Sequence, residues 1–344
     1  MFFHIRFRHF VVPVLMAAVM TLFTGCLEKD KKVPEQKNID QAVGFYVDAV
    51  VHHEAQEWEL ALEKLIKAIE INPRFSLAYS LRGDIYQQIT DFEKSAEAYE
   101  KATQLDPWSF NDYFNLGKVC RIMEKFVRSV KAFVRACELD PQHFEAHLYT
   151  AEVFFTLKEY DQAIAFSRMA EKIDPQRSEP QLLIGNVHEA NTNLVEAIAS
   201  YKRAMEIDGS QTDNMVSLAR AYLKTSQYDP AKELLDSAIA IDPQNALAYR
   251  HLGFAYLKLH DLDKAIGNYE MSAQLNRNDW ENQKALGVAY MIKAMKKNND
   301  KRLKVIDNNE VRSLKAKAIE HWKISLELNP NQPNLTEFLM LYSD

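Results

Sequence analysis

The chain has 344 residues, of which 47% are hydrophobic and 26% are charged, and it contains only 9 glycines. This composition suits a folded protein with a sizeable core and is poor in the residue clusters that strands and tight turns favour. The formal net charge of −6 argues against a nucleic-acid partner, and a total of 3 cysteines excludes a disulfide framework.

The start of the chain has the organisation of an export signal. Arg6 and Arg8 supply positive charge, and an apolar run over residues 11–23 follows them. This run is too short to span a membrane comfortably, which favours a cleaved signal over a permanent transmembrane helix. Residues 1–25 are therefore predicted to be a signal peptide.

The apolar run is followed by Gly25 and Cys26. This ending resembles the lipobox of bacterial lipoproteins. The resemblance implies cleavage after Gly25 and acylation of Cys26, which anchors the protein in a membrane, and Leu27 then directs it to the outer membrane, facing the periplasm. Residues 26–41 comprise the lipidated cysteine and a polar, flexible tether. A plain signal peptide with an incidental cysteine, or an uncleaved anchor, is the alternative interpretation.

Residues 110–143 predict a pair of helices. Small and apolar residues recur at the spacing of one helix face, first at Tyr113, Leu116, Gly117 and Cys120 and then at Ser129, Phe133 and Ala136. Asp140 and Pro141 end the second helix, because the residue before a proline is disfavoured in the helical region. This stretch of 34 residues resembles the tetratricopeptide (TPR) repeat, whose helices bury their apolar faces by stacking on neighbouring repeats.

The same frame of 34 residues extends over eight repeats. Their bounds are 42–75, 76–109, 110–143, 144–177, 178–211, 212–245, 246–279 and 280–332. In every repeat positions eight, twenty and twenty-seven hold glycine, alanine or serine, and a proline follows six of the eight second helices. Gly209 and Arg277 stand at the other two junctions. The resemblance implies an all-α fold, a right-handed α-solenoid of eight TPR helix hairpins, with a short capping helix over residues 333–344.

The eighth repeat carries an insertion of 19 residues between its helices. Residues 293–317 hold nine Lys or Arg against three Asp or Glu. We expect the first helix to continue past Met295, a polar turn at residues 298–300, and a second helix from about Asn309. This basic segment suggests binding to anionic lipid or lipopolysaccharide, with a solvated helix pair as the alternative.

The sequence offers no convincing catalytic or metal-binding pattern. His143, Glu145 and His147 superficially resemble a metal-binding helix. The repeat frame places His143 in a turn and His147 in the core, and no third ligand stands at a suitable spacing. We therefore predict a protein that is not an enzyme, with no metal, cofactor or small-molecule substrate. Cys120 and Cys137 are expected to be buried, free thiols.

In TPR proteins the first helices line a concave groove, and their positions two, five, nine, twelve and thirteen commonly contact a bound peptide. Transferring these positions by resemblance gives the candidate groove residues Tyr46, Asp84, Phe114, Lys118, Arg121, Glu145, Glu152, Phe155, Glu179, Asn186, Glu189, Arg220, Lys224, Arg250, Phe254, Lys258 and Lys284. This groove is basic in the third repeat, acidic in the fourth and fifth, and basic from the sixth onward. A solvated face without a single ligand is the alternative.

The functional hypothesis is a membrane-anchored scaffold or adaptor. It binds a peptide or protein segment in its groove by charge complementarity and aromatic contacts, and it supports assembly of a cell-envelope complex for pili, secretion or wall synthesis. TPR lipoproteins that assist pilus secretin assembly are the nearest analogy, and they share the repeat type alone. The alternative is an envelope protein whose basic eighth repeat binds the anionic surface itself.

Overall fold

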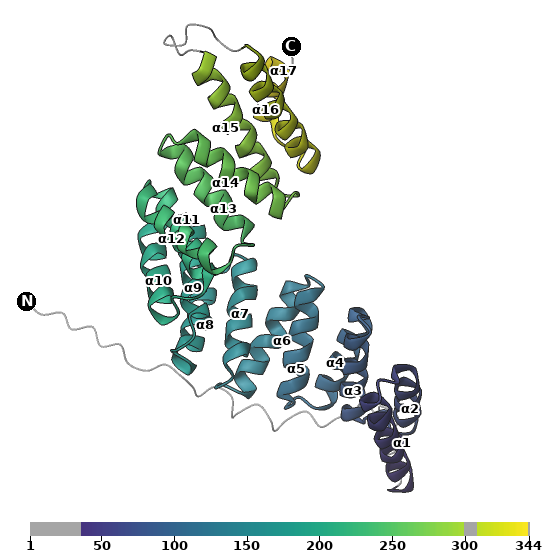
Figure 1. The fold of residues 1–344 in the computed structure, drawn as a ribbon. Helices are drawn as coiled ribbons and strands as arrows, with labels where there is room; N and C mark the ends of the chain where they lie inside the picture. Colours follow the sequence, from purple (N-terminus) through teal and green to yellow (C-terminus); the bar gives the residue numbers. More distant parts are fainter. Residues whose placement is uncertain (1–35, 299–307, 343–344) are drawn as a thin grey trace, which may run out of the picture. The chain divides into compact units, whose positions relative to one another are not determined.

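The computed structural model describes residues 36–298 and 308–342, and within these ranges it contains seventeen helices and no strand (Figure 1). The predicted all-α fold is thereby confirmed. The signal peptide, Cys26 and residues 299–307 of the insertion lie outside the described residues. The described residues divide into two compact bodies, an N-terminal body that ends at Arg74 and a second body that begins at Phe75.

The described residues of the N-terminal body form one helix pair, α1 (Gln36–Glu54) and α2 (Trp58–Ile71). Ala42 and Ala49 of α1 are fully buried, as are Leu65 and Ala68 of α2. Helix α1 begins at Gln36, so residues 36–41, which were expected to belong to the flexible tether, are helical. The reason is that no proline or glycine interrupts the chain between Gln36 and the first repeat, so the helix can extend backwards.

The second body stacks seven further helix pairs and a final helix. Their bounds are α3 (Ser76–Gln88), α4 (Phe92–Leu105), α5 (Phe110–Ile122), α6 (Phe126–Leu139), α7 (Phe144–Thr156), α8 (Tyr160–Ile173), α9 (Glu179–Ala190), α10 (Leu194–Ile207), α11 (Thr212–Lys224), α12 (Tyr228–Ile241), α13 (Ala246–Lys258), α14 (Leu262–Leu275), α15 (Trp280–Asn298), α16 (Asn308–Leu328) and α17 (Pro333–Tyr342). The first helices of these pairs begin within one residue of the predicted repeat starts. Helix α15 also continues past Met295, as expected.

In each repeat the residue at position eight is matched in size to the residue at position twenty-four, which packs against it. Glycine at position eight always faces an aromatic ring, in the pairs Gly83–Tyr99, Gly117–Phe133, Gly185–Tyr201, Gly253–Tyr269 and Gly287–Trp322. The three repeats with alanine at position eight instead carry a smaller residue at position twenty-four, namely Leu65, Ser167 and Leu235. A Cβ atom added at Gly253 would lie 2.8 Å from the Tyr269 ring, so the ring occupies the space that a methyl group would need.

The two junctions that lack proline are held by asparagine side chains. Asn214 follows the Gly209 junction, and its amide donates to two backbone oxygens of the preceding repeat at 3.0 and 3.3 Å. Asn282 follows the Arg277 junction and donates to a backbone oxygen of α14 at 2.9 Å. Asparagine stands at the third position of a repeat only in these two places. A buried side-chain hydrogen bond therefore stands where the other junctions have the rigid proline ring.

Candidate functional site

The first helices of the second body line one face of the stack. Helix α7 contacts α9, α9 contacts α11, α11 contacts α13, and α13 contacts α15. This first-helix face therefore carries the side chains at the predicted groove positions from α7 to α15. It is the surface on which residues of consecutive repeats come close enough to act together.

A cavity of about 400 Å³ opens on this face between α7, α9 and α11. It is lined by Phe155, Asn186, Glu189, Ala190, Arg220 and Lys224. Every lining residue except Ala190 was predicted from the repeat positions to face a ligand. The structure thus brings three predicted groove segments together into one pocket, which we call the Arg220 pocket.

One buried carboxylate organises the Arg220 pocket. The side chain of Glu189 is only 6% exposed, and its oxygens accept hydrogen bonds from Arg220 at 2.8 and 3.0 Å and from Tyr201 at 2.6 Å. The ammonium group of Lys224 lies 2.8 Å from the same carboxylate. Burial alone would raise the pKa of Glu189, but the hydrogen bonds from Arg220, Lys224 and Tyr201 outweigh burial and lower it. Glu189 is therefore ionised at neutral pH.

The charges in this pocket do not balance. Arg220 and Lys224 carry two positive charges and share the single negative charge of Glu189. Lys224 is half exposed, at 51%, so its ammonium group can reach a ligand as well as Glu189. Phe155 adds an apolar wall to the pocket. The arrangement suits an acidic group that is carried on an extended, partly apolar segment.

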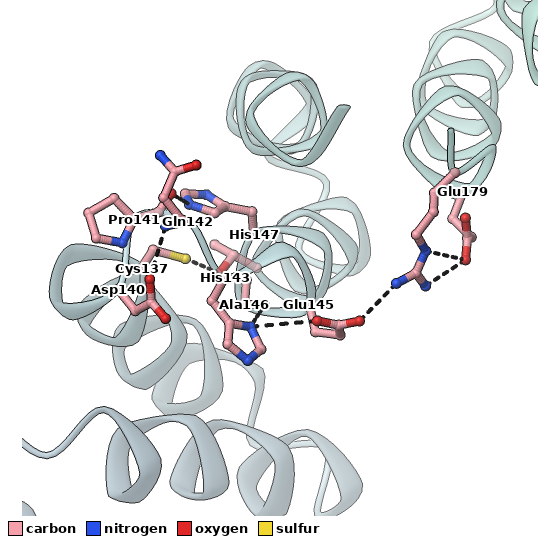
Figure 2. A network of polar contacts seen from close by, with 11 residues as sticks. Cys137, Asp140, Pro141, Gln142, His143, Glu145, Ala146, His147 and Glu179 are labelled. Carbon is pink, nitrogen blue, oxygen red and sulfur yellow. Dashed lines mark hydrogen bonds and ion pairs between the residues drawn. The ribbon is translucent and has the colours of Figure 1, made fainter. Parts of the chain in front are cut away.

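Elsewhere on this face the predicted charges pair with each other. The guanidinium group of Arg121 lies 2.5 Å from the carboxylate of Glu152, and this ion pair joins the third repeat to the fourth. Glu145 and Glu179 both bind Arg177, at 2.8 and 2.7 Å (Figure 2). The predicted basic and acidic regions therefore meet in ion pairs at these places, where opposite charges of adjacent repeats neutralise each other.

The same pairing is found at the seventh junction. Arg250 lies 3.0 Å from Asp279 and also pairs with Glu281. Neither Asp279 nor Arg177 was predicted as a site residue, since both lie in turns between repeats. A sequence signal for several of these pairs exists in hindsight, because opposite charges stand 31 residues apart in Arg121–Glu152, Glu189–Arg220 and Arg250–Glu281.

An aromatic cluster covers the first-helix face of the third and fourth repeats. Phe114 stacks on Phe110 and on Tyr149, with ring centroids 5.5 and 5.8 Å apart. The predicted residues Lys118 and Arg121 lie over these rings, Lys118 at 5.2 Å from the centroid of Phe114 and Arg121 at 4.5 Å from that of Tyr149. Burial lowers the pKa of Lys118. The cluster therefore combines apolar ring surface with two cations that lie over part of it.

The remaining predicted residues are spread along the chain. Asp84 accepts a hydrogen bond from Tyr99 at 2.5 Å and so supports its own repeat. Lys258 is exposed and lies 5.3 Å from the centroid of the Phe254 ring. Tyr46 and Lys284 are half-buried, and Tyr46 belongs to the N-terminal body. None of these residues lines the Arg220 pocket.

His143 at the end of the third repeat and His147 in the fourth have separate structural roles (Figure 2). The ring of His143 accepts a hydrogen bond from the backbone N–H of Ala146 at 3.2 Å and so caps the start of α7. The ring of His147 is buried and lies 3.1 Å from the backbone oxygen of Pro141. Their predicted placement in a turn and in the core is confirmed. Within the described residues no cluster of three potential metal ligands occurs.

Cys120 and Cys137 are buried and free, as predicted. Burial raises the pKa of both thiols, so they remain protonated at neutral pH. The Cys137 sulfur lies 3.4 Å from the hydroxyl of Thr150. These thiols serve as small core residues and do not belong to the candidate site.

The fold and the face defined by its first helices are those of a helical repeat protein of the solenoid class. Family models of the tetratricopeptide repeat match residues 76–107, 123–178, 190–239 and 219–260. The chain therefore carries tetratricopeptide repeats, as the spacing of its small residues indicated. A search of curated proteins found no significant match.

Solved structures share this fold. A tetratricopeptide repeat protein from Parabacteroides merdae has a TM-score of 0.60 at 14% identity, over 78% of this chain and 99% of that chain. The Cut9–Hcn1 hetero-tetramer of the APC/C has a TM-score of 0.59 at 20% identity, over 83% of this chain and 53% of that chain. The match therefore spans about half of that relative. The Pseudomonas aeruginosa protein pilF gives 0.50 at 20% identity, over 60% of this chain and 95% of that chain.

Proteins of this fold are typically protein-interaction scaffolds, and the fold itself is generally non-catalytic. Within the described residues no helix combines the length and the apolar character that a membrane span requires.

Proposed function

We propose that this protein is a non-enzymatic scaffold that binds an acidic peptide or protein segment on its first-helix face. The observation that carries the proposal is the Arg220 pocket, where two cations share one buried carboxylate beside an apolar wall. A carboxylate of the partner would accept hydrogen bonds from Lys224 and Arg220 and balance the remaining positive charge. The aromatic cluster around Phe114 then offers a second contact area for apolar side chains of the same segment.

Reversing the charge of Lys224 tests this proposal, while Arg220 and Tyr201 remain as hydrogen-bond partners of Glu189. In Lys224→Glu the pocket changes from net positive to net negative. A charge-assisted hydrogen bond contributes roughly 1.5–3 kcal/mol, so the affinity for acidic peptides should fall by about 10- to 100-fold. The measurement is fluorescence anisotropy with labelled peptides, of which one set is rich in Asp, Glu and Phe and the other has Asn and Gln at the acidic positions.

The matched control is Lys172→Glu, which makes the same charge change at an exposed position of the outward helix α8. It should leave peptide binding unchanged. Equal binding of the acidic and the neutral peptide sets, or an equal loss of binding in both variants, would contradict a specific role for the pocket.

We further propose that the protein is anchored at Cys26 to the outer membrane, facing the periplasm, and there supports assembly of an envelope complex of the pilus, secretion or wall-synthesis type. The support is the order of Arg6, the apolar run 11–23, Gly25 and Cys26 in the sequence. Several acyl chains on one cysteine give stable anchoring that one chain does not.

The anchor predicts a simple fractionation result. Wild type should stay with the membrane fraction after a high-salt wash, which removes proteins held by charge alone. Cys26→Ser should stop lipid attachment, and a mass spectrum of the wild-type N-terminal peptide should show an acylated residue 26 with residues 1–25 absent. A wild-type peptide that retains residues 1–25, or an unmodified Cys26, would rule out the lipoprotein assignment.

A further inference from the structure

The eighth repeat contains a second feature that the peptide-binding proposal does not use. Helices α15 and α16 have 19 and 21 residues, whereas the other helices of the second body have at most 14. The additional turns are packed, because Ala294 of α15 and Val311 and Leu314 of α16 belong to the same buried hydrophobic cluster as the rest of the eighth repeat. The described part of the extension is therefore a packed helix pair with a fixed outer surface.

Three lysines on the extended part of α15 border a cavity of about 520 Å³. Lys293, Lys296 and Lys297 form one side of it, and residues 259–263, which comprise the turn after α13 and the first two residues of α14, form the other. Lys297 also pairs with Glu310 of α16, while Lys296 is exposed and forms no ion pair among the described residues. We call this cavity the lysine pocket.

The pocket also contains two carboxylates, of which Asp263 is the more exposed. Asp263 pairs with Lys293, yet its side chain is 80% exposed. The hydrogen bond and charge of Lys293, together with the charges of Lys296 and Lys297, lower the pKa of Asp263 against a small effect of burial. The second acid of the pocket, Asp261, pairs with Lys264 outside it. An anion that enters could therefore replace Asp263 at low cost, since an exposed ion pair contributes little.

Exposed apolar residues stand beside these lysines, one in the cavity lining and two next to them in the sequence. Leu259 of the pocket is 36% exposed, and on α15 Ile292 and Met295, which are 39% and 38% exposed, directly precede Lys293 and Lys296. Ammonium groups interleaved with exposed aliphatic side chains match the boundary of a bilayer, where phosphate groups lie next to acyl chains. A free phosphate ion or a nucleic acid offers no partner for these aliphatic groups.

We propose that the lysine pocket binds the phosphate of an anionic phospholipid headgroup, with Leu259, Ile292 and Met295 facing the acyl boundary. The site is separate from the Arg220 pocket and does not depend on the peptide-binding proposal. It would hold the eighth repeat at a membrane surface and so add a contact to any lipid anchor at residue 26.

The test is flotation with vesicles, using protein that starts at residue 27 and so keeps every described helix. The protein should float with vesicles of phosphatidylcholine and phosphatidylglycerol and stay behind with phosphatidylcholine alone. Because each lysine near an anionic surface contributes a factor of about five, Lys293→Gln with Lys296→Gln and Lys297→Gln should reduce partitioning by about 100-fold. Lys101→Gln with Lys131→Gln and Lys172→Gln, at exposed sites on α4, α6 and α8, is the matched control.

Each outcome decides the proposal. An equal loss in the control triple variant would show unspecific attraction by net charge and overturn the site. Binding of inorganic phosphate that is lost in the triple lysine variant, together with no flotation of wild type on anionic vesicles, would assign the pocket to a free phosphate instead of a headgroup. The single variant Lys296→Glu controls for misfolding, because Lys296 forms no ion pair among the described residues. It should weaken flotation while circular dichroism shows unchanged thermal unfolding.

Discussion

Replacing Arg220 with alanine is expected to destabilise the second body by about 2–3 kcal/mol, because it removes the main partner of a buried carboxylate. Glu189 is only 6% exposed, and Arg220 provides it with hydrogen bonds from both Nε and Nη2. Lys224 remains 2.8 Å away and limits the loss. Urea unfolding at neutral pH, followed by circular dichroism, measures the effect.

The difference in the free energy of unfolding between wild type and Arg220→Ala should depend on pH with a defined sign. The folded pKa of Glu189 lies below its usual value, since hydrogen bonds from Arg220, Lys224 and Tyr201 outweigh burial. A carboxylate with a depressed folded pKa contributes stability above its unfolded pKa, and the contribution is lost as the pH falls through the folded pKa. The gap between wild type and Arg220→Ala should therefore be largest near neutral pH and narrow below about pH 4.

A double variant controls for simple loss of packing. Adding Glu189→Gln to Arg220→Ala removes the uncompensated charge while an amide can still accept the hydrogen bond from Tyr201. The double variant should be more stable than Arg220→Ala alone. Equal or lower stability of the double variant would mean that Arg220 acts through packing and not through its charge.

Gly253→Ala is expected to destabilise the seventh repeat by about 1–3 kcal/mol, because the added methyl group meets a fixed ring. The Cβ position lies 2.8 Å from Tyr269, whose side chain is only 1% exposed and has little room to move. The shift in the thermal unfolding midpoint measures the effect. Midpoints are preferred here, since stacked repeats can unfold in more than one step.

The partner substitution should restore part of the loss. Gly253→Ala combined with Tyr269→Leu reproduces the alanine–leucine pair that the sixth repeat has at Ala219 and Leu235. The hydroxyl of Tyr269 has no hydrogen-bond partner among the described residues, so leucine gives up no polar contact. The destabilisation of the double variant should therefore be smaller than the sum of the destabilisations of the two single variants. Strict additivity would show that positions eight and twenty-four are not coupled.

Part of the candidate site was predictable, because a repeat position fixes which way a side chain points. Phe155, Glu189, Arg220 and Lys224 were placed on the ligand-facing side of their helices by position alone, and they do line one pocket. Tyr149 was missed, since it stands at a position that does not commonly contact peptides. It completes the aromatic cluster by stacking on Phe114 of the preceding repeat.

The sequence by itself determined the repeat frame, the helix starts and the close packing of each helix pair. These depend on residues within 34 positions of each other, such as Gly253 and Tyr269, whose sizes are matched inside one repeat. Only the tertiary structure decided which charges are available to a ligand. The partner of Glu189 is Arg220 of the next repeat, and that of Lys293 is Asp263 of the previous one. The physical reason is that the stacking of repeats, not local periodicity, sets the distances between charges and therefore their interaction energies.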